Sequence, residues 1–248
     1  MVFEKKIRNV IKGAMGKLFT NIFDFFLPRI CPSCKTKLSS SEECICSDCF
    51  RNIKIAENEL LKVEYERDFK SKGFISDFTS AFVFEKDKEL QTLVHELKYN
   101  KRFLNAVFLG KQIAELRKSI IAEWEIDLVI PIPLHRLKLA ERGYNQAYYI
   151  SKGLSESLNI PLKSKAIKRK KFTQSQTKLT RKEREDNLTG AFELLNRSRR
   201  IINKKNVLII DDVITTGATT NECAKVLINA GAKRVYAASV AIAEFKTD

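Results

Sequence analysis

Two adjacent aspartates, Asp211 and Asp212, stand where a buried strand is expected to end. The aliphatic run Val207–Ile210 precedes them, and a threonine-rich turn and an expected helix follow in Val213–Thr219. Gly217 permits a tight turn, and the free N–H groups of such a turn and of a helix start bind anions. The three threonine hydroxyls of this stretch add donors for phosphate oxygens.

The two carboxylates repel a phosphate, so they are expected to face a neutral or cationic neighbour of it. Sugar hydroxyls, a metal ion or a developing positive charge would all satisfy this requirement. The pattern therefore predicts a site for a phosphorylated sugar, and it favours this interpretation over ordinary strand-end caps.

A cluster of cysteines offers a second kind of chemistry. Five of the six cysteines lie within nineteen residues: Cys31, Cys34, Cys44, Cys46 and Cys49. Two Cys-x-x-Cys pairs, Cys31 with Cys34 and Cys46 with Cys49, have the spacing of a structural zinc site with a closed ligand shell. Cys44 either competes as a ligand or packs as a buried thiol, and Cys223 is expected to be a small buried residue.

The charge of the 248-residue chain is uneven. Its formal net charge is +15, and residues 161–205 carry 15 lysines and arginines against four acidic residues. Such a segment predicts a polyanionic partner, either nucleic acid or a pyrophosphate-bearing small molecule, and a solvated basic loop is the alternative. The sequence contains no apolar run of about 18 residues and no secretory pattern, so a cytoplasmic protein without a transmembrane segment is expected.

Alternating helix and strand patterns predict an α/β fold, a mostly parallel sheet flanked by helices. Strands are predicted at 78–85, 127–133, 164–170, 191–195, 206–213 and 234–243, and helices at 90–98, 103–119, 144–158 and 218–230. An irregular basic loop is predicted over 172–188. Ligands of such sheets bind beyond the carboxyl ends of the strands, where the two aspartates are expected.

The predicted domain organisation has four parts. Residues 1–28 contain an amphipathic helix over 3–26, which either docks on its own protein or contacts a membrane surface or a partner. A small zinc-finger-like module with four cysteine ligands follows at 29–56, then a linker or short helix at 57–73 and the main α/β domain at 74–248.

The stretch Val207–Thr219 resembles the signature of type I phosphoribosyltransferases. Further motifs, Pro131–His135, Glu141–Gln146 and Asn187–Phe192, together with the cysteine pairs, resemble the ComF family of competence proteins. That resemblance implies a phosphoribosyltransferase-like domain behind a zinc-finger-like N-terminus.

The resemblance also implies site residues. It makes Asp211 and Asp212 the catalytic pair that holds the ribose hydroxyls. It implies a phosphate loop of Val213, Ile214, Thr215, Thr216, Gly217, Ala218 and Thr219. It implies pyrophosphate and mobile loops that contain Leu134, His135, Arg142, Gln174, Gln176, Arg181 and Arg184. A hydrogen-bonding role in the loop is the alternative for His135. The implied ligand is phosphoribosyl pyrophosphate with Mg²⁺.

Two functions are compatible with these motifs. The ComF resemblance implies a cytosolic protein of natural competence that handles incoming single-stranded DNA, with partners in the competence machinery. Its basic segment would follow the phosphates, and stacking faces would come from Tyr144, Tyr148, Tyr149 and Phe172. The alternative is an active Mg²⁺-dependent phosphoribosyltransferase whose acceptor cannot be inferred from the sequence.

Overall fold

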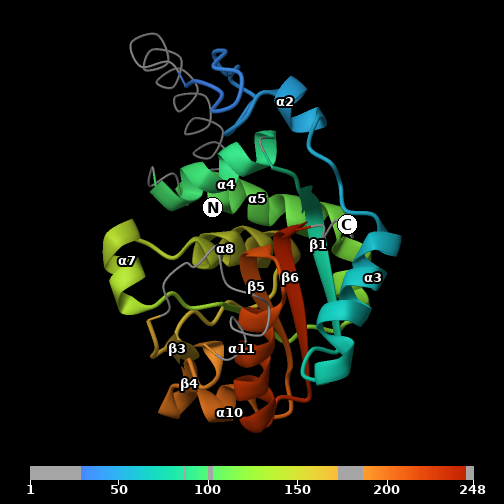
Figure 1. Ribbon diagram of the computed structural model, residues 1–248, viewed down its shortest axis with the longest axis vertical. Coiled ribbons are helices and arrows are strands. Elements are labelled where there is room, and N and C mark those ends of the chain that lie inside the picture. Colours follow the sequence, from blue (N-terminus) through green and yellow to red (C-terminus); the bar gives the residue numbers. More distant parts are fainter. Residues whose placement is uncertain (1–28, 87, 100–102, 173–186, 244–248) are drawn as a thin grey trace, which may run out of the picture. The chain divides into compact units, whose positions relative to one another are not determined.

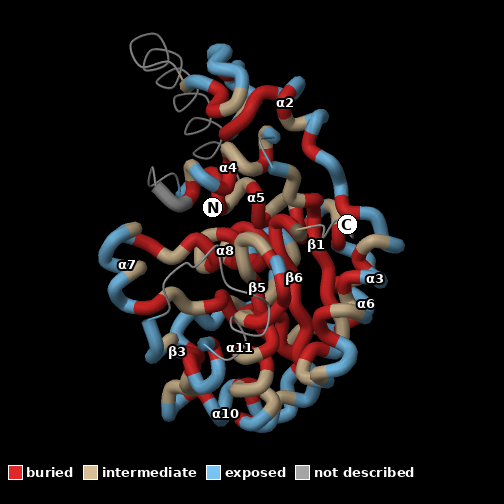
Figure 2. Tube along the Cα trace, in the orientation of Figure 1, coloured by how far each residue is buried: buried red, intermediate tan, exposed pale blue. Residues whose placement is uncertain are grey.

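A four-stranded parallel sheet is the centre of the larger part of the chain. The computed structural model describes residues 29–86, 88–99, 103–172 and 187–243. The sheet order is β1 (Asp77–Phe84), β6 (Arg234–Ala243), β5 (Asn206–Ile214) and β2 (Leu128–Pro131), and every neighbouring pair is parallel (Figure 1). The interiors of the strands are buried (Figure 2), as is typical of a parallel sheet with both faces covered. The predicted mostly parallel α/β fold is confirmed.

Helices cover the two faces of this sheet. On one face, α5 (Phe103–Leu116) and α8 (Gln146–Leu158) pack on each other and on the strands. On the other face, α11 (Ala218–Asn229) shares a core with the alternate β5 residues Val207 and Ile209. The remaining elements of this part are α3 (Asn58–Asp68), η1 (Lys70–Lys72), α4 (Glu89–Tyr99), α6 (Lys118–Glu123), α7 (Arg136–Arg142), η2 (Asn196–Ser198), α10 (Arg199–Ile202) and the antiparallel pair β3 (Ile167–Arg169) and β4 (Phe192–Leu194).

Two glycines bring α5 and α8 into backbone contact. A Cβ atom added at Gly110 would lie 2.0 Å from the carbonyl oxygen of Ile150, and one added at Gly153 would lie 2.1 Å from that of Val107. Real Cβ atoms essentially never approach so closely, so each glycine meets the main chain of the opposite helix. Neither position can carry a side chain without separation of the two helices.

The helix predicted over 103–119 is present as α5 but ends at Leu116, because the chain breaks at Arg117 before α6. The buried guanidinium of Arg117 donates from Nε to the carbonyl oxygen of Ser80 at 2.7 Å and from Nη2 to the carbonyl oxygen of Ala56. Burial lowers the pKa of this guanidinium. Arg117 thereby ties the chain before α3 to β1, and α6 begins after the break.

The charged segment at 57–73, which the sequence left open as a linker or a short helix, forms α3 and η1. The buried positions of α3 are Leu61 and two acids, Glu64 and Asp68, which form ion pairs with Arg67. Buried acids produce no apolar period, so the sequence pattern did not decide between a helix and a linker. Phe69, directly after α3, is fully buried in the main core.

The chain divides into two compact units between Asn52 and Ile53. The described part of the first unit is a small loop structure with one short helix, α2 (Ser47–Arg51), and an isolated bridge between Ile30 and Lys37. The amphipathic helix predicted over 3–26 lies outside the described residues. Among the described helices, none has the length and apolar character needed to cross a membrane.

Candidate functional site

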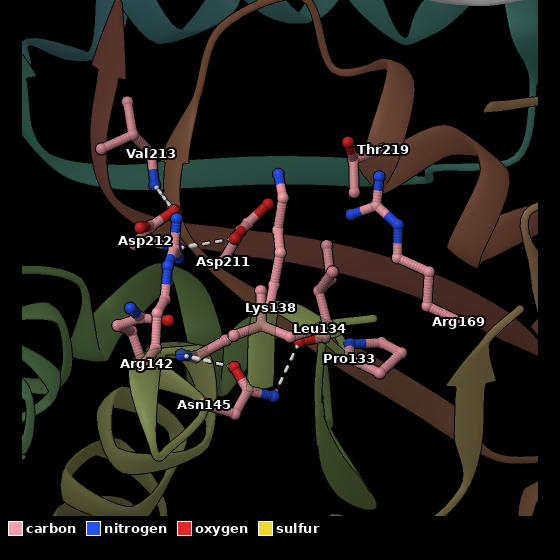
Figure 3. Close-up of a pocket in the computed structure, with 13 residues that line it drawn as sticks. Pro133, Leu134, Lys138, Arg142, Asn145, Arg169, Asp211, Asp212, Val213 and Thr219 are labelled. Atoms are coloured by element: carbon pink, nitrogen blue, oxygen red, sulfur yellow. Dashed lines mark hydrogen bonds between the residues drawn. The ribbon is translucent and has the colours of Figure 1, made fainter. Parts of the chain in front are cut away.

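The two aspartates stand at the carboxyl end of β5, as predicted. They line a pocket with a volume of about 200 Å³, and both are partly exposed there (Figure 3). The Oδ1 atom of Asp211 accepts a hydrogen bond from the N–H of Asp212 at 2.9 Å, and that of Asp212 accepts one from the N–H of Val213 at 2.8 Å. Each of these bonds restricts the orientation of the carboxylate near the carboxyl end of β5. The other lining residues are Ile132, Pro133, Leu134, Lys138, Arg142, Asn145, Gln146, Ala147, Arg169, Val213 and Thr219.

The threonine-glycine turn leads from β5 into the N-terminus of α11. Gly217 occupies the N-cap position with φ +64°, and among the described residues no side-chain cap bond is made there. The first turn also contains no acidic residue. Thr219, in that turn, lines the pocket, so uncapped N–H groups and the positive end of the helix dipole adjoin the aspartates.

Gly217 is required for a reason that the sequence did not reveal. A Cβ atom at this position would lie 2.7 Å from Cε1 and 2.8 Å from Cζ of Phe69. The side-chain Nδ2 of Asn221 donates to the carbonyl oxygen of Asp68 at 2.9 Å, which joins α11 to the end of α3. The turn is therefore supported from behind by the end of α3.

The segment after β2, which includes α7, places some of the predicted pyrophosphate-loop residues in the pocket. Leu134 and Arg142 line the pocket, but His135 does not. His135 is buried and caps α7, because its Nδ1 accepts a hydrogen bond from the N–H of Leu137 at 3.3 Å. Its ring also packs on Phe172, with 5.3 Å between the centroids. The geometry thus gives His135 the hydrogen-bonding role in the loop.

Four polar side chains of the pocket were missed by sequence reasoning: Lys138, Asn145, Gln146 and Arg169. Asn145 caps α8 and also donates to the carbonyl oxygen of Ile132 at 3.0 Å. Arg169 reaches the pocket because β3 is bridged to the chain at His135. Burial lowers the pKa of its guanidinium, and the negative charge of Asp211 opposes that shift. Only the tertiary contact of β3 brings Arg169 to this place, and no local motif signals it.

Other sequence-based expectations have mixed outcomes. Tyr144 is buried, its hydroxyl donates to the carbonyl oxygen of Leu97, and burial raises its pKa to about 12, so the prediction of a stacking face at Tyr144 is wrong. Phe172 is 44% exposed, and Cys223 is fully buried as expected. The mobile-loop residues Gln174, Gln176, Arg181 and Arg184 lie outside the described residues.

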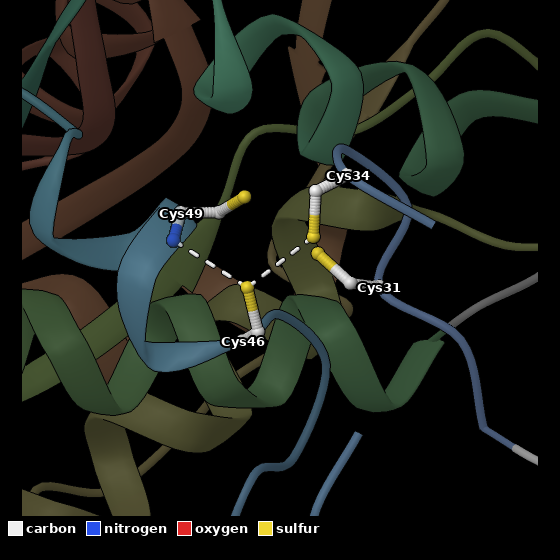
Figure 4. A group of neighbouring side chains, drawn as sticks. All are labelled: Cys31, Cys34, Cys46 and Cys49. Carbon is white, nitrogen blue, oxygen red and sulfur yellow. Dashed lines mark hydrogen bonds between the residues drawn. The ribbon is translucent and has the colours of Figure 1, made fainter. Parts of the chain in front are cut away.

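Four cysteines of the first unit form a cluster that could hold a metal ion. The Sγ atoms of Cys31, Cys34, Cys46 and Cys49 all lie within 4.8 Å of one another (Figure 4). A zinc ion at about 2.3 Å from each sulfur would place tetrahedral ligands about 3.8 Å apart, so small shifts complete such a site. Cys44 is buried but is not part of the cluster.

Hydrogen bonding and burial shift the pKa values of two thiols of the cluster in opposite directions. The Thr36 hydroxyl, 2.9 Å from the Cys34 Sγ atom, lowers the pKa of that thiol to about 6. Burial raises the pKa of Cys49 to about 12. The N–H of Cys49 donates to the Sγ atom of Cys46 at 3.5 Å, an arrangement that supports a thiolate ligand.

Known proteins resemble this chain in both sequence and domain type. Residues 104–244 match the family described as phosphoribosyl transferase domain. Competence protein F of Haemophilus influenzae is 40% identical over 109 residues, which are 44% of this chain and 47% of that protein. DNA utilization protein YhgH of Escherichia coli K12 is 30% identical over 150 residues, 59% of this chain and 64% of that protein. Competence protein ComFC of Streptococcus pneumoniae is 31% identical over 206 residues, 83% of this chain and 77% of that protein.

Proposed function

The chain belongs to the phosphoribosyl transferase domain family, within the group of competence F and ComFC proteins, and on that premise we propose its function. The proposed role is to bind phosphoribosyl pyrophosphate in the pocket of β5 and to handle incoming single-stranded DNA in the cytosol. One observation carries the first part of the proposal: the carboxylates of Asp211 and Asp212 share a pocket with the uncapped first turn of α11.

Each part of the pocket suits one part of this ligand. Asp211 and Asp212 accept hydrogen bonds from the ribose hydroxyls, and the N–H groups at the start of α11 donate to the 5′-phosphate. The cationic side chains Lys138, Arg142 and Arg169 bind the pyrophosphate. Mg²⁺ held beside the carboxylates of Asp211 and Asp212 would supply positive charge that offsets the charge of the pyrophosphate. The carboxylates also stabilise positive charge that develops on the sugar ring if pyrophosphate departs.

Replacement of both aspartates, Asp211→Asn with Asp212→Asn, should weaken phosphoribosyl pyrophosphate binding about 100-fold. Two hydrogen bonds to charged acceptors are worth about 3 kcal/mol together, and each 1.4 kcal/mol is about tenfold in affinity. Titration calorimetry in the presence of Mg²⁺ measures the effect. Asp127→Asn is the matched control, because Asp127 pairs with Lys205 at the start of β2 rather than in the pocket. Equal affinity of the double variant and the wild type would remove the basis of the proposal.

The Cys31, Cys34, Cys46 and Cys49 cluster is proposed to bind structural zinc. Four thiolates fill a tetrahedral shell and leave no position open for a substrate. The ion would hold together a segment of 24 described residues, 29–52, that has few apolar side chains of its own.

The proposal of strand handling predicts binding of single-stranded DNA with strong salt dependence. Basic side chains that neutralise phosphates release counterions, so the logarithm of affinity should fall with the logarithm of salt by about 0.7 per phosphate contact. Fluorescence anisotropy of a labelled oligothymidylate across a salt series tests this. Absence of binding at low salt, or binding that is insensitive to salt, contradicts the role in strand handling and leaves the sugar-phosphate proposal untouched.

A further inference from the structure

We infer that a groove at the amino end of the sheet is a binding surface for single-stranded nucleic acid, separate from the sugar-phosphate pocket. This inference rests on the proposed handling of DNA strands and gives it a location. The groove, called here the basic groove, has a volume of about 290 Å³. Its lining includes Leu128, Leu162, Lys163, Lys165, Ile201 and Ile202.

The basic groove lies at the opposite end of the strands from the aspartates. Leu128 is the first residue of β2 and pairs with Val207 near the start of β5. Asp211 stands four residues further along β5, which places it roughly 13 Å away at about 3.3 Å per residue. A ligand in the groove therefore leaves the pocket of Asp211 and Asp212 accessible.

Lys163 and Lys165 line the groove, and the two chain segments that supply most of its lining carry further positive charge. Residues 161–166 and 196–205 contain no acidic residue. They carry the exposed cations Lys163, Lys165, Arg197, Arg199, Arg200, Lys204 and Lys205. Among the described residues, only Lys205 of this set has an ion-pair partner, Asp127 at 2.8 Å. Figure 2 shows exposed residues around α10.

Two other lysines of the same basic stretch have an acidic partner. On β3 and directly after it, Lys168 and Lys170 share the carboxylate of Glu193, at 3.4 Å and 2.8 Å. Among the described cations of residues 161–205, Lys168 and Lys170 are therefore paired beside β4, whereas Lys163 and Lys165 of the groove have no ion-pair partner among the described residues.

An apolar floor distinguishes this surface from a simple patch of lysines. Ile201 follows the α10 arginines and is 43% exposed, and Leu162, which lines the same groove, is partly exposed. The walls are held in place, since the N–H of Lys163 donates to the carbonyl oxygen of Val129 at 2.9 Å and the Ser198 hydroxyl to that of Lys165 at 3.4 Å. The groove is therefore formed before any ligand arrives.

A basic rim over an apolar floor matches an unpaired strand. The phosphates contact the cations at the edge of the groove, such as Lys163 and Lys165. The exposed face of a base covers the apolar side chains of Leu162 and Ile201. A duplex keeps its base faces stacked inside, and a free phosphate has no apolar face. The volume is near the lower limit of small-molecule pockets, about 300 Å³, which suits one base at a time.

The test compares two triple variants of the full chain that remove equal charge. The groove variant carries Lys163→Gln, Lys165→Gln and Arg199→Gln, and the control carries Lys152→Gln, Lys168→Gln and Lys170→Gln, whose lysines have ion-pair partners. The groove variant should bind labelled oligothymidylate at least about tenfold more weakly at low salt, with a salt slope lower by about 2 for three lost contacts. The control should stay within about twofold of the wild type, a small charge effect. Calorimetric binding of phosphoribosyl pyrophosphate should be unchanged in both.

A second variant tests the apolar floor without a change of charge. Ile201→Ser should weaken single-strand binding about fivefold through lost apolar contact and leave the salt slope unaltered. Equal losses in the two triple variants, or no loss in either, overturn the groove assignment. Binding of phosphatidylserine vesicles that depends on the groove while strand binding does not also overturns it. If the wild type binds no single-stranded DNA, the proposed strand handling itself is contradicted. If the wild type binds DNA and the groove variants bind it equally well, only the location in the groove is contradicted.

Discussion

Alanine at position 217 should abolish phosphoribosyl pyrophosphate binding and lower the free energy of unfolding by several kcal/mol. Gly217 has φ +64°, a conformation that costs a residue with a Cβ atom about 1–2 kcal/mol. The added Cβ would lie 2.7 Å from Phe69, which is fully buried and packs on Phe78 with 5.1 Å between the ring centroids. Overpacking of such a core costs about 1–3 kcal/mol more. Relief of the clash must displace the turn that precedes α11, and with it the N–H donors.

Gly73→Ala is the matched control for this prediction. Gly73 has nearly the same backbone conformation, φ +68°, but nothing lies within 4 Å of an added Cβ. It should show the conformational cost alone and retain ligand binding. Urea unfolding and calorimetry measure the two effects, and Phe69→Leu combined with Gly217→Ala should restore part of the stability. If Gly217→Ala lowers the free energy of unfolding and the ligand affinity no more than Gly73→Ala does, contact with Phe69 is not the reason that position 217 requires glycine.

Removal of one ligand of the cysteine cluster should release zinc and unfold the first unit while the second unit stays folded. Loss of a residue that only orients a ligand costs about 10–100-fold in metal affinity, so Cys46→Ser should cost at least about 100-fold. Because most of the stability of so small a module comes from the metal, residues 29–52 should then become sensitive to protease. Mass spectrometry measures the loss of zinc, and limited proteolysis detects the unfolding of residues 29–52. Calorimetric binding of phosphoribosyl pyrophosphate reports whether the second unit stays folded.

Cys44→Ser provides the control for the cluster. Cys44 is buried like most of the ligands but stands outside the group of four, so its variant should retain one zinc ion per chain. Full zinc occupancy in Cys46→Ser would show that the four sulfurs are not the ligand set. Loss of sugar-phosphate binding on chelation would contradict the independence of the two units.

Local patterns were sufficient for the parts of the fold that follow one period. The aliphatic run of β5 correctly predicted a buried strand that carries Asp211 and Asp212 towards its carboxyl end, although the strand continues two residues past them to Ile214. The Cys-x-x-Cys spacing predicted which four sulfurs come together. In each case the residues that specify the feature are close in sequence.

Features set by distant contacts were beyond this reasoning. Arg169 enters the pocket only because β3 bridges to the chain at His135. Tyr144 looks like an exposed aromatic residue in the sequence, but its hydroxyl finds a carbonyl acceptor at Leu97 in the interior. The buried acids of α3 were invisible to a search for apolar periodicity, since their burial depends on Arg67.

The crossing of α5 and α8 determines how the sugar-phosphate pocket can deform. At Gly110 and Gly153 the main chains of α5 and α8 are in direct contact. A sideways shift of α8 therefore cannot be accommodated by a change of side-chain rotamers. The pocket wall that α8 contributes, beginning at Gln146, is consequently stiff. The cationic wall of the pocket, Lys138 and Arg142 of α7 and Arg169 of β3, lies outside this helix crossing, so for the proposed ligand, selectivity at the pyrophosphate end should tolerate substitution better than the wall formed by α8.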